Sequence, residues 1–297
     1  MTLRARNRRR LIGASLLAPL AASGRAENAA RDDAPLRFGT TAVFLDDQMA
    51  LLAAWQRYLE RETGRTVQFV QRGNYREIVD LLLGDRIDAA WLCGYPYVAY
   101  ESRLALVAVP VYQGAPLYRS YLIVPDKDAR TQRIADLRGA VFAFSDALSN
   151  SGYLVPKVEL VRAGATPEAF FRRTFFTYAH RKVVEAVRVG LADGGAVDGY
   201  VWDTLQAQQP LATSGLRVAW RSPAYGFPPI VARRSAPDAR ISPLVRALLA
   251  MPASDEGRKL LERLNIEGFA AGDSALFDSI RDLVRESAGM DPPRSRR

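Results

Sequence analysis

Short β-type runs alternate with amphipathic helical stretches along most of the chain, and this pattern constrains the fold more than any other feature. Strand-like residues 36–40 and 66–71 enclose a helical stretch at residues 48–62, and residues 88–93 follow a second helical stretch at 76–83. Alternation of this kind is typical of α/β proteins, in which helices cover mostly parallel sheets. We therefore predict an α/β fold, and 297 residues leave room for two lobes.

Farther along, the same pattern predicts strands at residues 105–112, 118–124, 140–144, 174–177, 196–202, 217–220 and 230–232. Helices are predicted at residues 151–162, 182–190, 241–251, 255–264 and 274–287, and a loop at residues 94–96. A helix, a glycine and an aliphatic-Asp step into a strand occur at Gly84 to Asp88 and again at Gly194 to Asp198. This echo is either coincidence or the mark of two lobes of one design, with a ligand in the crevice between them.

The first 26 residues have the three parts of an export signal. Residues 1–10 are basic, residues 11–22 are apolar, and Ser23-Gly24-Arg25-Ala26 forms a small-residue exit. The apolar run is shorter than the roughly 20 residues that span a bilayer. We expect residues 1–26 to be a cleaved signal peptide of the Sec or twin-arginine type and the mature protein to be periplasmic. The alternative is the basic terminus of a cytosolic protein.

Charge and cysteine content exclude several functions. The formal net charge is +9, but six of the 41 basic residues precede Glu27, and the 35 that remain nearly balance 32 acidic ones. This argues against a nucleic-acid partner. One cysteine and one histidine cannot close a disulfide or supply a tetrahedral zinc site. We expect neither a metal nor another cofactor.

The segment from Phe144 to Pro156 carries the strongest chemical signal. A predicted strand ends there, serine and asparagine follow, and a helix begins near Ser151. Unpaired N–H groups at a helix start, beside hydroxyl and amide side chains, form a cradle for an anion. The same residues are also the commonest N-caps, so a purely structural role stays open.

Residues 149–156, Ser-Asn-Ser-Gly-Tyr-Leu-Val-Pro, resemble the Ser-Thr-Ser-Gly-aromatic-Leu-Val-Pro signature of periplasmic phosphate-, phosphite- and phosphonate-binding proteins of the phosphonate-transport type. Further motifs of that family occur in the same order at residues 88–91, 118–124, 134–139, 177–180 and 197–199, so the resemblance spans about residues 36–264. It implies a two-lobed solute-binding fold of type II that closes over an oxyanion. Lobe 1 would contain residues 36–115 and 224–290, lobe 2 residues 116–223, and residues 291–297 would form a basic tail.

The resemblance also implies site residues. The anion's oxygens would be held by Ser149, Asn150, Ser151 and Gly152 with the N–H groups that follow them. His180 matches the family's anion-contacting histidine and could donate a hydrogen bond or add charge; its alternative is a surface capping residue.

The resemblance adds aromatic and acidic positions to the expected site. Tyr118 matches an aromatic residue that closes the pocket. Tyr95 and Tyr97 could take this part instead or simply pack in the core. Asp203 lies about where phosphonate binders carry an acid for a substrate ammonium, although a solvated aspartate at a helix start fits equally well.

Two departures from the family pattern restrict the ligand. The segment from Tyr225 to Val231 is apolar where aminoalkylphosphonate binders have a second acid, which argues against an ammonium-bearing ligand. Cys93 stands where the family commonly has a glycine facing the cleft. It is either an inert small residue or a ligand-contacting thiol, and related periplasmic sensors bind arsenite through one cysteine. Arsenite is therefore the alternative ligand, because soft sulfur suits arsenic(III) better than it suits phosphate.

An enzyme is not expected. Ser151, His180 and Asp203 could be aligned as a triad, but no Gly-x-Ser-x-Gly elbow is present. We predict a monomeric solute-binding protein for a small oxyanion. Its partner would be the permease of an ABC transporter or, in the arsenite alternative, a sensor histidine kinase.

Overall fold

The computed structural model describes residues 34–41 and 49–288. The predicted signal peptide and the predicted basic tail lie outside these residues, as does the first residue of the helix expected at 48–62. From Pro35 onward the described residues belong to one compact unit. This unit is mixed α/β, as the alternating pattern predicts.

The first sheet has six strands within the described residues, in the order β13-β4-β12-β3-β1-β2. β1, β2 and β3 run parallel, whereas β12 pairs antiparallel with both β3 and β4. The strands span Gly268–Ala270 (β13), Leu104–Val111 (β4), Ile230–Arg233 (β12), Ala89–Trp91 (β3), Leu36–Thr41 (β1) and Val67–Arg72 (β2). Both ends of the described chain therefore contribute strands to this sheet.

The second sheet has five strands within the described part, in the order β10-β6-β9-β7-β8. β7 runs parallel to β8 and β9, and β6 is antiparallel to β9 and β10. The strands span Leu216–Arg221 (β10), Ser120–Pro125 (β6), Gly194–Asp198 (β9), Val141–Phe144 (β7) and Arg173–Phe176 (β8). Every strand of this sheet comes from the middle of the sequence.

Two passages of chain connect the two sheets. The first leaves β4 and forms β5 (Leu117–Tyr118), and the second leaves β10 and forms β11 (Tyr225–Gly226). β5 and β11 pair antiparallel, and the Phe227 amide donates to the Pro116 carbonyl over 2.9 Å. The crossings are thus tied together as a two-stranded ribbon.

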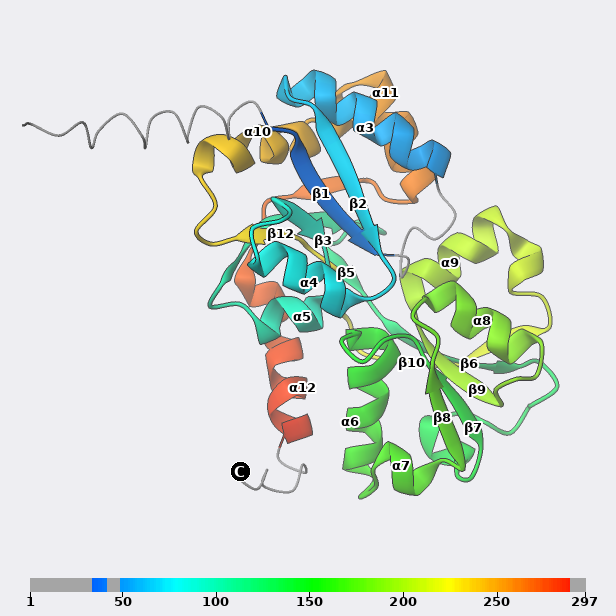
Figure 1. Ribbon diagram of the computed structural model, residues 1–297. Helices are drawn as coiled ribbons and strands as arrows, with labels where there is room; N and C mark the ends of the chain where they lie inside the picture. Colours follow the sequence, from blue (N-terminus) through cyan, green and yellow to red (C-terminus); the bar gives the residue numbers. More distant parts are fainter. Residues whose placement is uncertain (1–33, 42–48, 289–297) are drawn as a thin grey trace, which may run out of the picture. The chain divides into compact units, whose positions relative to one another are not determined.

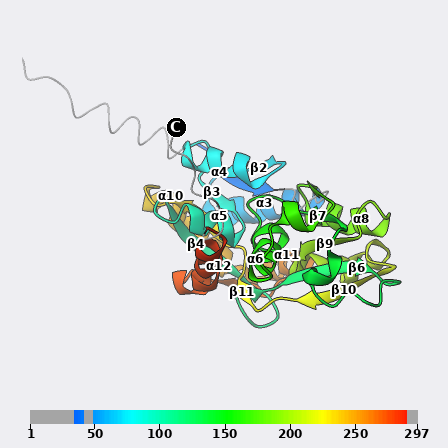
Figure 2. The same ribbon diagram turned by 90° about the horizontal axis from the view of Figure 1, so that it is seen from below.

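Helices cover both sheets. α3 packs against β2 and beside α11, and α6 packs beside α12, as both Figure 1 and Figure 2 show. The helices span Met49–Thr63 (α3), Tyr75–Leu83 (α4), Gly94–Ala99 (α5), Val155–Arg162 (α6), Pro167–Phe170 (α7), His180–Arg188 (α8), Gly199–Gln208 (α9), Asp238–Leu249 (α10), Asp255–Leu264 (α11) and Asp278–Ala288 (α12). Shorter helical turns span Ile134–Leu137 (η1), Asn150–Leu154 (η2), Pro210–Ala212 (η3), Met251–Ala253 (η4) and Ser274–Phe277 (η5).

The strand predicted at residues 196–202 is wrong in its second half. β9 ends at Asp198, and α9 begins at Gly199. Val201 and Trp202 are buried, so an unbroken apolar run continues from the strand into the helix. Periodicity cannot separate a buried strand from the first turn of a buried helix. The loop expected at residues 94–96 is likewise the start of α5.

Candidate functional site

The turn that follows β7 is organised by its own side chains. Ser149 caps the single turn of π-helix η2, and its Oγ accepts a hydrogen bond from the Gly152 amide over 3.0 Å. A Cβ on Gly152 would lie 1.9 Å from the Oγ of Ser145, so only glycine fits there. Ser145, Ser149 and Gly152 are all buried. The predicted cradle is therefore a tightly packed turn at the carboxyl end of a strand.

Asn150 joins this turn to Cys93, which follows β3 of the first sheet, and to Tyr118 of the β5–β11 ribbon. Its backbone amide donates to the Sγ of Cys93 over 3.1 Å, and its side-chain Nδ2 donates to the Tyr118 hydroxyl over 3.0 Å. The sulfur and that hydroxyl lie 3.9 Å apart. Burial raises the pKa of the Cys93 thiol. Burial, reinforced by nearby Cys93 and Asp198, also raises the pKa of Tyr118 well above its usual value. Both groups therefore carry their protons at neutral pH.

His180 is the first residue of α8 and is fully buried. Its Nδ1 accepts a hydrogen bond from the Asp198 amide over 3.1 Å, so the neutral ring carries its proton on Nε2. Burial lowers the pKa of His180 to about 3. The imidazole is thus a neutral donor at physiological pH rather than a positive charge.

Asp198 ends β9 and caps α9, with its Oδ1 accepting from the Tyr200 amide over 2.8 Å. The residue is completely buried. Burial raises the pKa of its carboxyl well above the usual value, and the nearby charge of Asp203 adds to the rise. Asp198 lies in one of the family motifs, at residues 197–199, but the resemblance did not imply it as a site residue.

The parallel registers of the two sheets reveal three pairs of equivalent positions. β1 of the first sheet and β7 of the second each lie between two parallel neighbours. Phe38 of β1 pairs with Phe69 on β2 and Ala89 on β3. In the same way, Phe142 of β7 pairs with Thr174 on β8 and Gly194 on β9. Moving the same number of residues along each pair of strands gives three equivalent pairs of positions. They are Thr41 with Ser145, Tyr75 with His180, and Cys93 with Asp198. All six are buried and lie at or just beyond the carboxyl ends of parallel strands, where ligands bind in open α/β sheets. The sequence echo aligned Asp88 with Asp198 instead, but Asp88 precedes β3 and forms an ion pair with Arg240.

Tyr75, which follows β2 of the first sheet, lies beside the turn that follows β7. It begins α4, and its amide donates to the Oδ2 of Asp146 over 3.1 Å. Burial raises the pKa of its hydroxyl well above the usual value, reinforced by Cys93, Asp146, Asp198 and Tyr118, so these groups lie near one another. No local sequence signal marks Tyr75, because its position depends on the register of β2.

Several enclosed polar atoms of these elements make no hydrogen bond to the part of the chain that the structure describes. They are the hydroxyls of Thr40, Thr41, Ser145 and Ser151, the Oδ1 of Asn150 and the Oδ2 of Asp198. The Ser151 side chain approaches the Tyr118 hydroxyl without forming a hydrogen bond to it. A buried polar atom without a partner costs about 1–3 kcal/mol, so such a concentration indicates a site built for a polar ligand.

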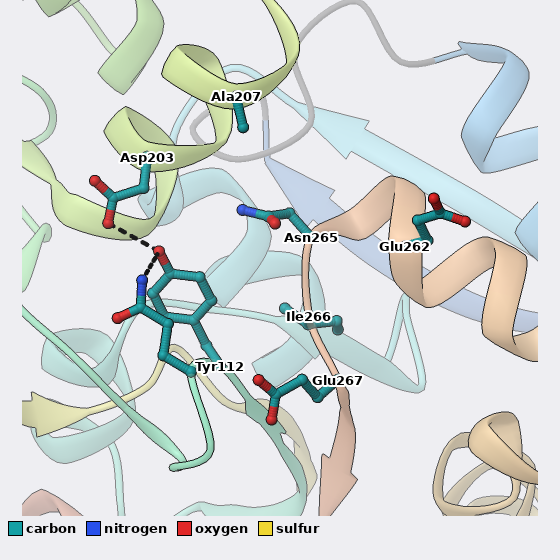
Figure 3. A pocket seen from close by; sticks show the side chains of 8 residues that line it. Tyr112, Asp203, Ala207, Glu262, Asn265, Ile266 and Glu267 are labelled. Carbon is teal, nitrogen blue, oxygen red and sulfur yellow. Dashed lines mark hydrogen bonds between the residues drawn. The ribbon is translucent and has the colours of Figure 1, made fainter.

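Two expected site residues lie elsewhere. Tyr97, on α5, packs its ring edge-on against Phe277 at 4.8 Å between centroids, which is a packing role. Asp203 lies one turn into α9, where its carboxylate accepts from the hydroxyls of Tyr112 and Tyr121 over 2.8 and 3.1 Å. Figure 3 shows it pointing toward Tyr112 in a cavity of about 360 Å³ that Glu262, Asn265 and Glu267 also line. The structure therefore does not bring Tyr97 or Asp203 together with the serine turn.

Within residues 34–41 and 49–288, no group of three or more His, Cys, Asp or Glu side chains is arranged to hold a metal ion. None of the helices in these residues is long and apolar enough to cross a membrane.

Comparison with known proteins gives consistent matches. Residues 38–277 match the model of a family described as ABC transporter, phosphonate, periplasmic substrate-binding protein. The phosphate-import protein PhnD of Mycolicibacterium smegmatis is 27% identical over 231 residues, which cover 73% of this chain and 70% of that protein. The phosphonates-binding periplasmic protein of Escherichia coli is 25% identical over 267 residues, covering 86% of this chain and 78% of the other. Among solved structures, a binding-protein component of an ABC phosphonate transporter from Pseudomonas aeruginosa superposes with a TM-score of 0.78 at 25% identity, covering 86% of this chain and 87% of that one.

Proposed function

This chain belongs to the family of periplasmic substrate-binding proteins of phosphonate ABC transporters, and from that premise we propose that it captures a small phosphorus oxyanion and delivers it to a permease. Its two-lobed fold is that of a binding protein rather than an enzyme. The ligand is of the phosphate, phosphite or phosphonate class, and its site is the cluster around Ser145, Asn150, Ser151, His180 and Asp198.

The enclosed hydroxyl and amide groups are the observation that carries this proposal. The hydroxyls of Ser145 and Ser151 are buried and make no hydrogen bond within the described residues. Neither arginine nor lysine occurs among the cluster residues, and His180 is neutral. An anion here would be held by oriented neutral donors, which work in a buried site because water does not compete with them. An oxyanion with several acceptor oxygens suits this arrangement.

The aromatic wall beside Tyr118 supports a ligand without an ammonium group. Phe227 is fully buried, and its ring lies 5.8 Å from that of Tyr118 and 5.1 Å from that of Tyr200. Phe227 belongs to the apolar segment that replaces the family's second acid. A hydrogen or methyl substituent on phosphorus can pack against such a surface, whereas an ammonium group would have no carboxylate there.

The connections between the sheets support closure of two lobes around the ligand. The β5–β11 ribbon joins the two sheets, and Asn150 contacts Cys93 and Tyr118 at this junction. A ligand bound by groups from both sheets would stabilise the closed arrangement, as in hinge closure of other binding proteins. The closed form is the one that we propose docks on the permease in the periplasm.

Replacing Ser151 with alanine tests the proposed function. The substitution removes a buried hydroxyl that lacks a partner, so the free energy of unfolding is expected to stay unchanged or rise by up to about 1 kcal/mol. Affinity for the ligand is expected to fall about tenfold, because one donor to the anion is lost. Thermal unfolding and calorimetric titration with phosphate, phosphite and methylphosphonate measure both quantities.

Ser149→Ala is the matched control. The Ser149 Oγ caps the Gly152 amide, so this variant is expected to lose about 1 kcal/mol of stability. A Ser151→Ala variant that is destabilised like Ser149→Ala and keeps full affinity would show that both serines serve only to build the turn.

Replacing Cys93 with serine separates phosphorus oxyanions from arsenite. The buried thiol already accepts the Asn150 amide, and a serine oxygen can accept the same bond. Because thiolate is the form that ligates arsenic and burial raises the pKa of this thiol, the site favours the phosphorus ligand. Affinity for methylphosphonate is therefore expected to stay within about threefold of wild type. Arsenite binding by the wild type that disappears in Cys93→Ser would instead support a sensory protein with a histidine kinase as partner.

A further inference from the structure

Asp198 is the only carboxyl group among the three pairs of equivalent buried positions. Its Oδ1 is used by the cap of α9, but its Oδ2 makes no hydrogen bond to any residue that the structure describes. The role of N-cap accounts for one oxygen only. The second oxygen is enclosed, and leaving it without a partner is costly.

Within the part of the chain that the structure describes, the groups that face Asp198 include no cation. Tyr75 on α4, Cys93 before α5 and Tyr118 on β5 all lie close enough for its charge to raise their pKa values. Tyr112 at the end of β4 and Tyr200 on α9 feel the same charge. His180 on α8 accepts the Asp198 amide and is neutral, and Asp203 on α9 adds a second negative charge. Nothing in this set would neutralise an ionised Asp198 beside a bound anion.

A fully ionised anion and an ionised carboxylate could not both be buried here. Like charges a few ångströms apart in a poorly solvated site repel strongly, and one of them takes up a proton instead. An anion that carries a proton, or that can accept one near neutral pH, avoids this cost. Phosphate, phosphite and phosphonates all have an ionisation near neutrality, as phosphoryl groups generally do. Sulfate has none in that range.

We propose that Asp198 selects the ligand by its proton: the Asp198 Oδ2 and one ligand oxygen share a single hydrogen, and an anion that carries a proton or readily takes one up is bound in preference to sulfate, for which the carboxyl alone must hold the proton. The inference rests on the proposed function, because it concerns the same site. When the free carboxylate is ionised and the ligand is a dianion, binding takes up one proton from solvent. The proton then lies in the hydrogen bond between the carboxyl and the ligand, and no other bond changes.

Asp198→Asn tests this proposal, because asparagine has nearly the same shape as aspartate but no carboxyl group. Asparagine also caps helices well, so α9 keeps its N-terminus. Its Nδ2 would donate to the anion without a shared proton. Wild-type protein is expected to bind methylphosphonate at least about a hundredfold more tightly than sulfate, and Asp198→Asn to bring the two within about tenfold. Calorimetric titration with each anion at neutral pH measures both ratios.

The pH dependence provides a second readout. Above the pKa values of the free ligand and the free carboxyl, binding to the wild type takes up one proton. In that range, the affinity for methylphosphonate is therefore expected to fall by up to about tenfold for each pH unit. In Asp198→Asn this dependence is expected to disappear. Asp273→Asn is the control, since Asp273 also caps a helical turn but lies exposed at the start of η5. This control should reproduce the wild-type ratio of methylphosphonate to sulfate affinity and the wild-type dependence of affinity on pH.

The outcomes separate this inference from the proposed function. No binding of phosphate, phosphite or methylphosphonate by the wild type defeats the proposed function. Wild-type binding of methylphosphonate and sulfate with similar affinity overturns the inference alone. The inference is also overturned if Asp198→Asn still binds sulfate far more weakly than methylphosphonate and keeps the wild-type pH dependence. The pH dependence would then belong to another of the surrounding groups.

Discussion

Replacing Asn150 with aspartate is expected to lower oxyanion affinity at least about a hundredfold while the protein still folds. The new side chain has the shape of the old one but cannot donate to the Tyr118 hydroxyl as Asn150 Nδ2 does over 3.0 Å. It also adds a second carboxyl to a buried cluster that already contains Asp198. Calorimetric titration with methylphosphonate measures the loss, and circular dichroism checks the fold.

Asn150→Thr is the matched control for this variant. Threonine stands at the equivalent position of the family signature that residues 149–156 resemble, and its hydroxyl can donate a hydrogen bond. We expect it to keep affinity within about tenfold of wild type. If Asn150→Asp bound methylphosphonate as tightly as Asn150→Thr, the anion would have to bind away from η2.

Replacing Gly152 with alanine is expected to reduce both stability and binding. The added Cβ would lie 1.9 Å from the Ser145 Oγ, 2.7 Å from the Ser145 Cβ and 3.1 Å from the His180 Cε1, so these side chains must move. Overpacking of this kind costs about 1–3 kcal/mol in the free energy of unfolding. Affinity is expected to fall more than about tenfold, because the same side chains line the proposed site. Chemical denaturation and titration measure the two effects.

Gly73→Ala controls for the loss of a glycine as such. A Cβ at Gly73 meets nothing within 4 Å, and the residue precedes the capping Asn74 on the surface. The free energy of unfolding of Gly73→Ala is expected to differ from that of the wild type by less than about 0.5 kcal/mol. A Gly152→Ala protein as stable as Gly73→Ala would contradict the close packing described for η2.

Local sequence signals predicted the elements best where strands and helices are separated by clear turns. The strand at residues 36–40 and the helix at residues 255–264 correspond closely to β1 and α11, since a capping serine precedes α11 and Asn265 ends it in the left-handed conformation. The boundary between β9 and α9 was missed because the apolar run does not stop at Asp198.

The composition of the proposed site depends on contacts that local patterns do not contain. The serine turn could be recognised because its residues are consecutive. Tyr75 and Cys93 reach the cluster only through the registers of β2 and β3 beside β1. Tyr97 could be offered only as a substitute for Tyr118 or as a core residue, and the structure places its ring on α5 against Phe277. Pairing of distant strands, rather than propensity, decides which side chains meet.

A crystal structure of the mature protein grown with methylphosphonate tests the central claim most directly. We predict one ligand between η2 and the starts of α8 and α9, with its oxygens within hydrogen-bond distance of Ser145, Ser151 and Asp198. Such bonds are about 2.5–3.0 Å long between oxygen atoms. A ligand found instead in the cavity beside Tyr112 and Asp203, or an empty cluster at saturating ligand, would contradict the assignment.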